Sequence, residues 1–219
     1  MDNLLKEKLI DIAREKMKEH DPSHDISHSL RVLFLAEKIA INENSDLDII
    51  IPAAIFHDVI NYPKNHEKRL HSSKESAEFI KNILENLKDF PKNKIEKVYE
   101  SIKLCSFSKG LIPDFIEAKI LQDADGLESM GAISVMRTFA SAGTLKRKFY
   151  EELDPFCKTR VPDDSVYALD LFFTRLLVVH QRLHTKTAKE LAKKRMEFLQ
   201  LFLHELKYEL SETINPKIL

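Results

Sequence analysis

The sequence has only four glycines, no tryptophan and two cysteines among its 219 residues. Glycine-rich turns and alternating runs of β-branched residues are therefore largely missing, which argues against a β-rich fold. The two cysteines, Cys105 and Cys157, cannot build a disulfide framework, so we expect a reducing compartment, the cytoplasm. No apolar run approaches the roughly 18 residues that a membrane span requires.

A strong net charge is also missing, because 34 basic residues face 35 acidic ones. Binding to long nucleic acid rewards many contacts between basic side chains and phosphates, so a nearly neutral chain is poorly suited to it. The basic clusters at 146–148 and 193–195 are more simply solvated helix faces. We therefore expect neither long nucleic acid nor a membrane as a partner.

The sequence is rich in leucine, isoleucine, alanine, glutamate and lysine, which together favour a helical fold. Apolar residues recur at helical spacing along most of the chain. We predict a single all-α domain over residues 1–219, a compact helical bundle with an irregular flap near 144–163. The first helix is amphipathic rather than a signal peptide. Helices are predicted over 2–19, 24–44, 48–61, 75–88, 93–107, 115–126, 128–142, 166–180 and 185–210.

The segment 49–63, IIIPAAIFHDVINYP, begins as an apolar run and ends with His57 and Asp58 followed by a proline. Pro52 suits the first turn of a helix, and Pro63 would end that helix. An imidazole and a carboxylate then lie at the inner end of a buried helix. A buried carboxylate needs a partner, and a divalent cation would accept both groups. The alternative is a core histidine capped by the neighbouring carboxylate.

Further nitrogen and oxygen donors are His24, Asp25 and His28 at the start of one helix, and Asp123 and Asp125 in QDADG. A transition-metal site needs such donors from several helices, with positions left open. His24 and His28 are four residues apart, so both can project from one helix face. The two aspartates are two apart and cannot face the same way, so we expect one ligand between them. A carboxylate-rich C-terminal helix cap with no chemistry is the alternative for QDADG.

The ordered motifs H-x-x-R-V from His28, F-H-D ending at Asp58 and D-A-D-G-L from Asp123 resemble the HD-domain superfamily of metal-dependent phosphohydrolases. Longer pieces, D-P-S-H-D, H-D-V-I-N-Y-P-K-N-H and K-I-L-Q-D-A-D-G-L-E-S-M-G-A-I, resemble one bacterial branch of uncharacterised or nucleotide-acting HD hydrolases. The likeness runs from about Asp21 to Phe198. It implies an all-α bundle of the HD-domain type.

The resemblance implies four metal ligands, with Asp125 favoured over its neighbour because the family's A-D-x-L matches residues 124–127. Two imidazoles and two carboxylates suit one Mn²⁺, Fe²⁺, Co²⁺, Ni²⁺ or Mg²⁺, and Zn²⁺ is also compatible. The branch often carries a histidine where this chain has Cys105, which argues against a binuclear site. The implied ligands are His28, His57, Asp58 and Asp125.

The implied reaction is hydrolysis of a small phosphate ester or anhydride, with a nucleotide as the favoured substrate. Nucleoside triphosphate pyrophosphohydrolase activity ranks above monophosphatase activity by resemblance. A non-catalytic nucleotide-binding regulatory module with the HD fold is the alternative.

Residues around the predicted metal would complete the chemistry. Asp58 is expected to be catalytic as well as a ligand. Lys64 and His66 follow the His57–Asp58 pair and would stabilise charge developing on phosphoryl oxygens. We expect Arg31, Asn61 and Arg69 to bind substrate, whereas an ordinary charged loop is the alternative for the cations. His180 and His184 are interpreted as core or surface histidines.

Overall fold

The computed structural model describes residues 1–21, 23–62, 66–106 and 110–213. These residues are mainly helical, and β-structure among them is limited to one isolated bridge between Lys148 and Tyr167. The all-α prediction is therefore confirmed. Contacts group the chain into two compact units, Met1–Gly126 with Leu183–Ala188 and Leu127–Arg182 with Lys189–Leu219. The single domain over residues 1–219 stays a prediction.

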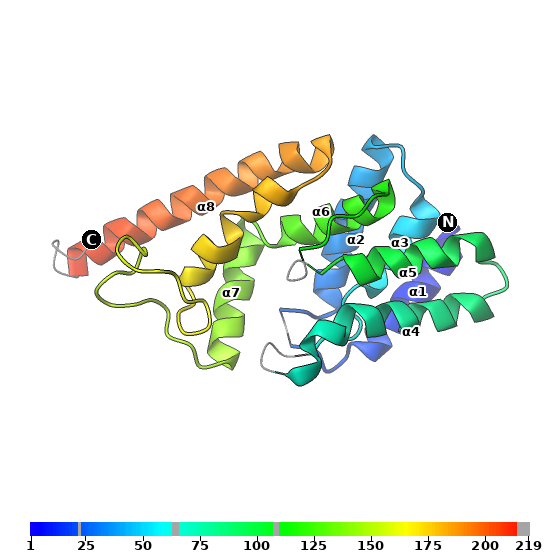
Figure 1. The fold of residues 1–219 in the computed structure, drawn as a ribbon, viewed down its shortest axis with the longest axis horizontal. Helices are drawn as coiled ribbons and strands as arrows, with labels where there is room; N and C mark the ends of the chain where they lie inside the picture. Colours follow the sequence, from blue (N-terminus) through cyan, green and yellow to red (C-terminus); the bar gives the residue numbers. More distant parts are fainter. Residues whose placement is uncertain (22, 63–65, 107–109, 214–219) are drawn as a thin grey trace. The chain divides into compact units, whose positions relative to one another are not determined.

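The first unit is built around α3, which contacts α1, α2, α4 and α5 (Figure 1). Every residue from Ile49 to Phe56 is buried, so this helix forms the centre of the hydrophobic core. Burial of its apolar side chains supplies the main stabilisation of this unit. The elements are α1 (Asn3–Lys16), α2 (Ile26–Asn42), α3 (Leu47–Phe56), η1 (Glu67–His71), α4 (Ser72–Asn86), η2 (Lys92–Lys94), α5 (Ile95–Leu104) and α6 (Ile116–Glu128).

The ends of α3 differ from the prediction for 48–61. Asp46 caps the helix by accepting a hydrogen bond from the N–H of Asp48 at 2.9 Å. Because α3 starts at Leu47, Pro52 lies inside the helix, and its predicted place in the first turn is wrong. Pro52 has no backbone N–H, so the helix lacks the hydrogen bond to the carbonyl of Asp48, four residues earlier. The helix also ends at Phe56, five residues earlier than predicted.

The chain after α3 is held by serine side chains of α4 instead of continuing as helix. The N–H of Ile60 donates to Ser76 Oγ at 3.0 Å, and the N–H of Tyr62 donates to Ser72 Oγ at 3.2 Å. These bonds satisfy backbone donors that a longer helix would have paired internally. Pro63, predicted to end the helix, lies outside the described residues.

The second unit contains α7 (Ala132–Thr144), the π-helical turn η4 (Phe172–Leu176), the 3-10 helix η5 (Val179–Arg182) and most of α8 (Lys186–Thr213). The continuous α-helix predicted over 166–180 is wrong in its start and type, because helical structure begins at Asp170 and continues as η4 and η5. Asp170 instead accepts hydrogen bonds from the Arg160 guanidinium and from the N–H of Asp163, which fastens an irregular stretch to this point. Phe139 contacts the fully buried Phe172, the half-buried Phe202 and the exposed Phe149 in this unit.

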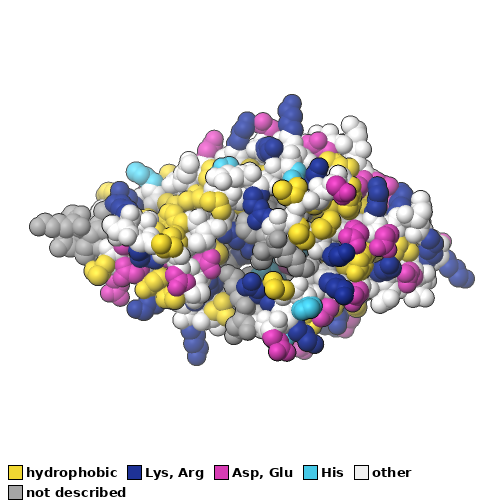
Figure 2. All heavy atoms as spheres, viewed as in Figure 1, with side chains coloured by type: hydrophobic (Ala, Val, Ile, Leu, Met, Phe, Trp, Pro, Cys, Tyr) yellow, Lys and Arg dark blue, Asp and Glu magenta, His cyan; other side chains and the backbone are white. Residues whose placement is uncertain are grey.

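Charged side chains of both signs are interspersed over α4 and α5 on the face drawn in Figure 2. Lys81 pairs with Glu96 at 2.8 Å there, and Lys103 pairs with Glu100 at 2.8 Å. Among the described helices, none combines the length and the apolar character needed to cross a bilayer.

Candidate metal centre

Four side chains from distant parts of the sequence converge in the first unit. His28 comes from α2, His57 and Asp58 follow α3 directly, and Asp125 comes from α6. The Nε2 atoms of His28 and His57 are 3.2 Å apart. His28 Nε2 lies 3.6 Å from Asp58 Oδ2 and 3.7 Å from Asp125 Oδ1. His57 Nε2 lies 3.7 Å and 3.9 Å from the same two oxygens.

Helix ends place the two histidines. Asp25 caps α2 and accepts a hydrogen bond from the N–H of His28 at 3.0 Å, which fixes His28 in the first turn. His57 is the residue that closes the buried helix α3. Both imidazoles are buried, with side-chain exposures of 0% and 1%, whereas the carboxylates of Asp58 and Asp125 are 29% and 17% exposed. The carboxylates therefore form the side of the cluster that a ligand can reach.

The hydrogen bond of His57 suits metal binding. Its Nδ1 lies 2.9 Å from the carbonyl oxygen of Ala54, so Nδ1–H donates and Nε2 keeps a lone pair directed to the cluster. Ligands about 2.1 Å from one ion lie about 3–4 Å from one another. The spacings between the two histidines, and from each histidine to the two carboxylates, fall in this range. His28, His57 and Asp125 fit a single divalent cation, because their donor atoms all lie within 4.8 Å of one another. Asp58, the fourth predicted ligand, lies within 3.7 Å of both histidine nitrogens.

The lowered pKa of Asp58 also favours binding of a cation. Burial acts to raise the pKa of Asp58, but the neighbouring His57, His28 and His24 lower it, and the net pKa lies well below the ordinary 3.8. Asp58 is therefore ionised at neutral pH. A cation stabilises an ionised carboxylate that is largely shielded from water.

A family model for the HD domain matches residues 25–130, a range that contains all four donors. Bacillus subtilis YpgQ, described as an uncharacterized protein, is 30% identical over 196 residues that cover 88% of this chain and 87% of YpgQ. The chain belongs to the HD-domain family.

Solved structures agree with this membership. YpgQ in complex with ADP has a TM-score of 0.71 at 29% identity, covering 94% of this chain and 97% of YpgQ. The Lin1889 protein from Listeria innocua has a TM-score of 0.70 at 32% identity, covering 96% and 98% of the two chains. An HD-superfamily hydrolase from Bacillus thuringiensis has a TM-score of 0.69 at 25% identity, covering 94% and 96%.

In this HD-domain protein, Asp123 does not join the metal cluster. It is fully buried and accepts hydrogen bonds from the N–H groups of His184 and Thr185 at 2.7 and 2.8 Å and from Thr185 Oγ1 at 2.7 Å. Burial raises the pKa of Asp123, and the bonds from Thr185 and His184 offset part of that rise. Asp123 therefore anchors the segment that leads into α8. Because α6 continues to Glu128, QDADG lies inside the helix, and the C-terminal cap that was its alternative is wrong.

His184 and His180 belong to different units. His184 Nε2 is 2.8 Å from Gln122 Oε1, a contact within the first unit. His180 is an exposed residue of the second unit.

His66 is held by its neighbours at the start of η1. Its Nδ1 accepts a hydrogen bond from the N–H of Lys68 at 3.1 Å, so Nε2 carries the proton of the neutral ring. The ring stacks on Tyr62 with centroids 4.7 Å apart and planes 13° apart. The Tyr62 hydroxyl donates to Glu75 at 2.6 Å. An exposed imidazole is thus fixed in orientation just beyond Asp58 in the chain.

The remaining predicted substrate residues are partly described. Arg31 is half-buried on α2, one turn after His28, and Asn61 is half-buried between two backbone anchors. Arg69 is exposed on η1. Lys64 lies outside the described residues. Their roles toward a substrate stay predictions.

His24 is a neighbour of the cluster that the predicted set of site residues leaves out. Its ring lies 6.0 Å from that of His28, centroid to centroid, at an interplanar angle of 79°. It is half-buried and acts electrostatically on Asp58. The four-residue spacing to His28 is the sequence signal that points to this position.

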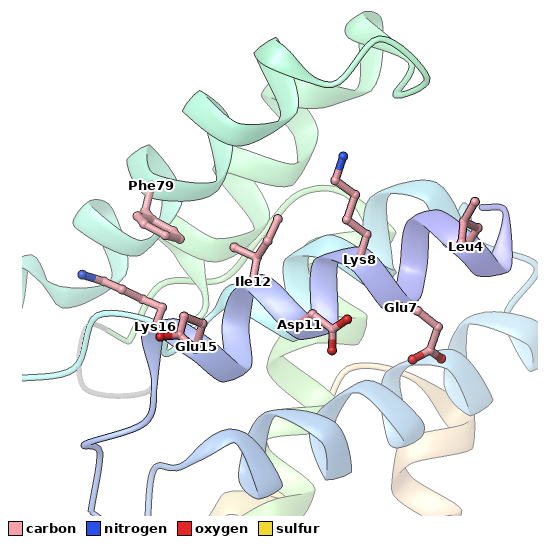
Figure 3. A pocket seen from close by; sticks show the side chains of 8 residues that line it. All are labelled: Leu4, Glu7, Lys8, Asp11, Ile12, Glu15, Lys16 and Phe79. Carbon is pink, nitrogen blue, oxygen red and sulfur yellow. The ribbon is translucent and has the colours of Figure 1, made fainter.

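A surface groove of about 960 Å³ lies elsewhere in the first unit (Figure 3). Its walls are the outer face of α1, with Leu4 and Ile12, and Phe79 of α4. Lys16 Nζ lies 5.6 Å from the centre of the Phe79 ring. The lining residues and the metal cluster do not overlap.

Proposed function

We propose that this protein is a metal-dependent phosphohydrolase whose substrate is a nucleotide. The observation that carries the proposal is the convergence of His28, His57, Asp58 and Asp125, with the nearest donor atoms 3.2 Å apart. Membership of the HD-domain family supports a hydrolase. The ADP complex of YpgQ supports a nucleotide as the ligand, because that relative covers nearly the whole chain.

When bound, the ion would supply positive charge that polarises a phosphoryl oxygen and acidifies water. The chain's own residues would hold the ion and bind the substrate. Asp58, ionised and partly exposed, would hold the ion and offer an oxygen on the side open to substrate. Lys64, His66 and Arg69 would bind the phosphates and stabilise charge on their oxygens, with Arg31 as a further cation.

Among phosphohydrolase activities we favour cleavage of a nucleoside triphosphate to the monophosphate and pyrophosphate. The products of nucleotide hydrolysis distinguish pyrophosphohydrolase activity from monophosphatase activity. Purified protein should contain about one metal ion per chain by elemental analysis. Incubation with nucleoside triphosphates and Mn²⁺, Co²⁺, Ni²⁺ or Mg²⁺ should release pyrophosphate and nucleoside monophosphate. Orthophosphate alone would instead indicate a phosphatase.

Cys105 favours a second candidate, a nucleotide-binding regulatory module without turnover. This residue is buried and closes α5 at a position where the related branch often has histidine. Calorimetric binding of ADP with no turnover under any of the four metals would support the module and contradict the hydrolase.

A matched pair of variants tests the location of the site. Asp58→Ala removes a charged donor that no neutral neighbour replaces, so metal content and activity should both be lost. His180→Ala changes an exposed histidine of the second unit and should leave metal content unchanged. Equal metal loss in both variants would place the site elsewhere.

A further inference from the structure

The segment that leads from the metal cluster toward η1 is tied to one face of α4. Ser76 Oγ accepts a hydrogen bond from the N–H of Ile60 at 3.0 Å and donates to the Ile60 carbonyl at 3.2 Å. Ser72 Oγ accepts from the N–H of Tyr62 at 3.2 Å, and Glu75 accepts from the Tyr62 hydroxyl at 2.6 Å. The three α4 residues are three or four positions apart, so they share one helix face. Tyr62 is therefore held by α4 through its backbone and through its side chain.

Tyr62 in turn supports the ring of His66. The two rings are stacked, with centroids 4.7 Å and planes 13° apart. His66 Nδ1 accepts a hydrogen bond from the N–H of Lys68 at 3.1 Å, and the His66 carbonyl accepts from the N–H of Arg69 at 3.1 Å. Stacking fixes the plane of the ring, and the bond at Nδ1 decides which of its edges faces η1. Because a backbone N–H can only donate, Nδ1 is the acceptor and Nε2 carries the proton.

This support matters because His66 is exposed. Exposed side chains change rotamer within nanoseconds, and a mobile donor loses that freedom when it binds a ligand, which weakens binding. Tyr62 supplies the order beforehand, since its own ring is held by the bond to Glu75. Among the described residues, none accepts a hydrogen bond from His66 Nε2, so its proton is available to a ligand. A preorganised N–H of this kind suits a phosphate oxygen.

We propose that Tyr62 and Glu75 are positioning residues for phosphate binding, which hold the His66 ring so that its Nε2–H meets a phosphate oxygen of the bound nucleotide. This inference rests on the proposed function, because it requires a phosphorylated ligand at the metal centre. Tyr62 acts through His66 and does not need to touch the substrate itself. The neutral ring already donates from Nε2, so the contact does not depend on the ring gaining a proton.

The test measures how much of the effect of Tyr62 passes through His66. ADP affinity is determined by calorimetry with Mn²⁺ for the wild-type protein, Tyr62→Leu, His66→Ala and the double variant, and metal content by elemental analysis. His66→Ala should bind ADP about ten- to hundredfold more weakly. Tyr62→Leu removes the stacked ring and should weaken binding by about two- to tenfold. The double variant should bind no more weakly than His66→Ala, because Tyr62 then has no ring to position. All variants should keep their metal.

Glu75 allows a test by conservative rescue. Glu75→Ala leaves the Tyr62 hydroxyl without its acceptor and should weaken ADP binding by about two- to fivefold. Glu75→Gln keeps a side-chain oxygen that can accept from the hydroxyl, so it should restore most of the wild-type affinity. Nuclear magnetic resonance checks the stack without nucleotide. The ring protons of His66, identified as the signals missing from His66→Ala, should shift downfield in Tyr62→Leu because they no longer lie over an aromatic face.

Tyr99→Leu is the matched control, because Tyr99 is a half-buried tyrosine of α5, and it should bind ADP as the wild-type protein does. Circular dichroism checks folding. If Tyr62→Leu does not fold, the Glu75 variants decide, and equal ADP affinity in Glu75→Ala and Glu75→Gln would overturn the inference.

Three further outcomes would overturn the positioning role while leaving nucleotide hydrolysis intact. They are wild-type ADP affinity in Tyr62→Leu, wild-type affinity in His66→Ala, and a double variant in which the two separate losses multiply. Metal loss from Tyr62→Leu would also overturn it, by making Tyr62 a support of the metal cluster. A wild-type protein that neither binds ADP nor cleaves a nucleotide would overturn the proposed function and this inference together.

Discussion

Asp123 and Asp125 lie two residues apart on α6, and their side chains point to different places. Asp123 is fully buried and receives the first N–H groups of the segment that begins α8. Asp125 lies at the metal cluster and is partly exposed. Helix geometry separates them, because residues two apart point about 200° from one another around the axis. Asp123 therefore stabilises the fold, whereas Asp125 can bind the metal.

The pair predicts opposite outcomes for two alanine substitutions. Asp125→Ala should lose metal and activity, while its stability stays close to that of the metal-free wild-type protein. Asp123→Ala leaves two N–H groups and a hydroxyl without their acceptor, so unfolding should become easier by about 1–3 kcal/mol, with metal retained. Elemental analysis and urea denaturation measure the two effects. If folded Asp123→Ala protein lost its metal, this would contradict the assignment of fold stability to Asp123 and metal binding to Asp125.

The segment after Asp58 predicts variants that keep metal but lose turnover. Lys64→Ala or His66→Ala should retain full metal occupancy and lose about ten- to thousandfold in kcat/KM, if the contacts strengthen in the transition state. His66 also caps η1 through Nδ1, so His66→Asn, which offers an oxygen as the capping acceptor, separates capping from phosphate binding. Lys68→Ala, an exposed neighbour on η1, is the control. Wild-type rates in both test variants would remove these residues from the site.

How far the sequence predicts these residues depends on their chemistry. The apolar run that ends at His57 and Asp58 is visible in the sequence, so these two residues could be predicted as metal ligands from the pattern. The choice of Asp125 over Asp123 as a ligand required the family motif. The orientation of His24 rests on Ser23 and Asp21, whose contacts depend on a turn that composition does not specify. Side-chain networks of this kind become visible only in three dimensions.

At the scale of elements, Asp170 explains where helix prediction failed. The apolar spacing over 166–180 favours an α-helix, yet buried Asp170 pairs with Arg160 through bonds of 2.5 and 2.7 Å. The N–H of Asp163 donates to the same carboxylate at 2.6 Å. These bonds hold the preceding irregular stretch at Asp170, where the helical structure begins, because local helix propensity is a weak preference.

Asp170→Ala should destabilise the protein by about 3–5 kcal/mol, because it leaves the Arg160 charge without its partner. Chemical denaturation followed by circular dichroism measures the change. Glu152→Ala, at an exposed position of the same irregular stretch, should change stability by no more than about 0.5 kcal/mol. Similar small effects in both variants would show that the ion pair does not hold this stretch.

Asp154 in the same stretch predicts a dependence of stability on pH. Burial raises its pKa, but hydrogen bonds from the N–H groups of Thr159 and Lys158 and from the Thr159 hydroxyl outweigh this, so its net pKa is below the ordinary 3.8. The unfolded chain then binds this proton more readily than the folded one, and stability is lost as pH falls. The stability difference between wild type and Asp154→Asn should be present above pH 3.8 and shrink below it. A difference that does not change with pH would contradict this.

At the scale of the whole molecule, composition was enough to predict an all-α protein, since glycine is rare and helix formers dominate. The division into two units could not be predicted in the same way. One boundary falls between Gly126 and Leu127 inside α6, and another falls between Ala188 and Lys189 inside α8. Continuous helices cross both boundaries, so no proline- or glycine-rich linker marks them in the sequence.

The metal centre predicts how the whole protein responds to metal removal. Its four donors belong to α2, the end of α3 and α6, so one ion would link three segments of the first unit. An ion that binds only the folded state stabilises it by about 2.7 kcal/mol at a hundredfold excess over Kd. At about 2–4 °C per kcal/mol, a chelator should lower Tm by roughly 5–10 °C.

Circular dichroism should show a helical protein with and without metal, because the helices around α3 are held by apolar burial rather than by the ion. Asp125→Ala should have the lower Tm from the start and show no further shift with chelator. His180→Ala should shift as the wild-type protein does. A chelator shift of equal size in Asp125→Ala would mean that the stabilising ion binds elsewhere. Loss of most helical signal on metal removal would mean that the ion, and not the apolar core, organises the fold.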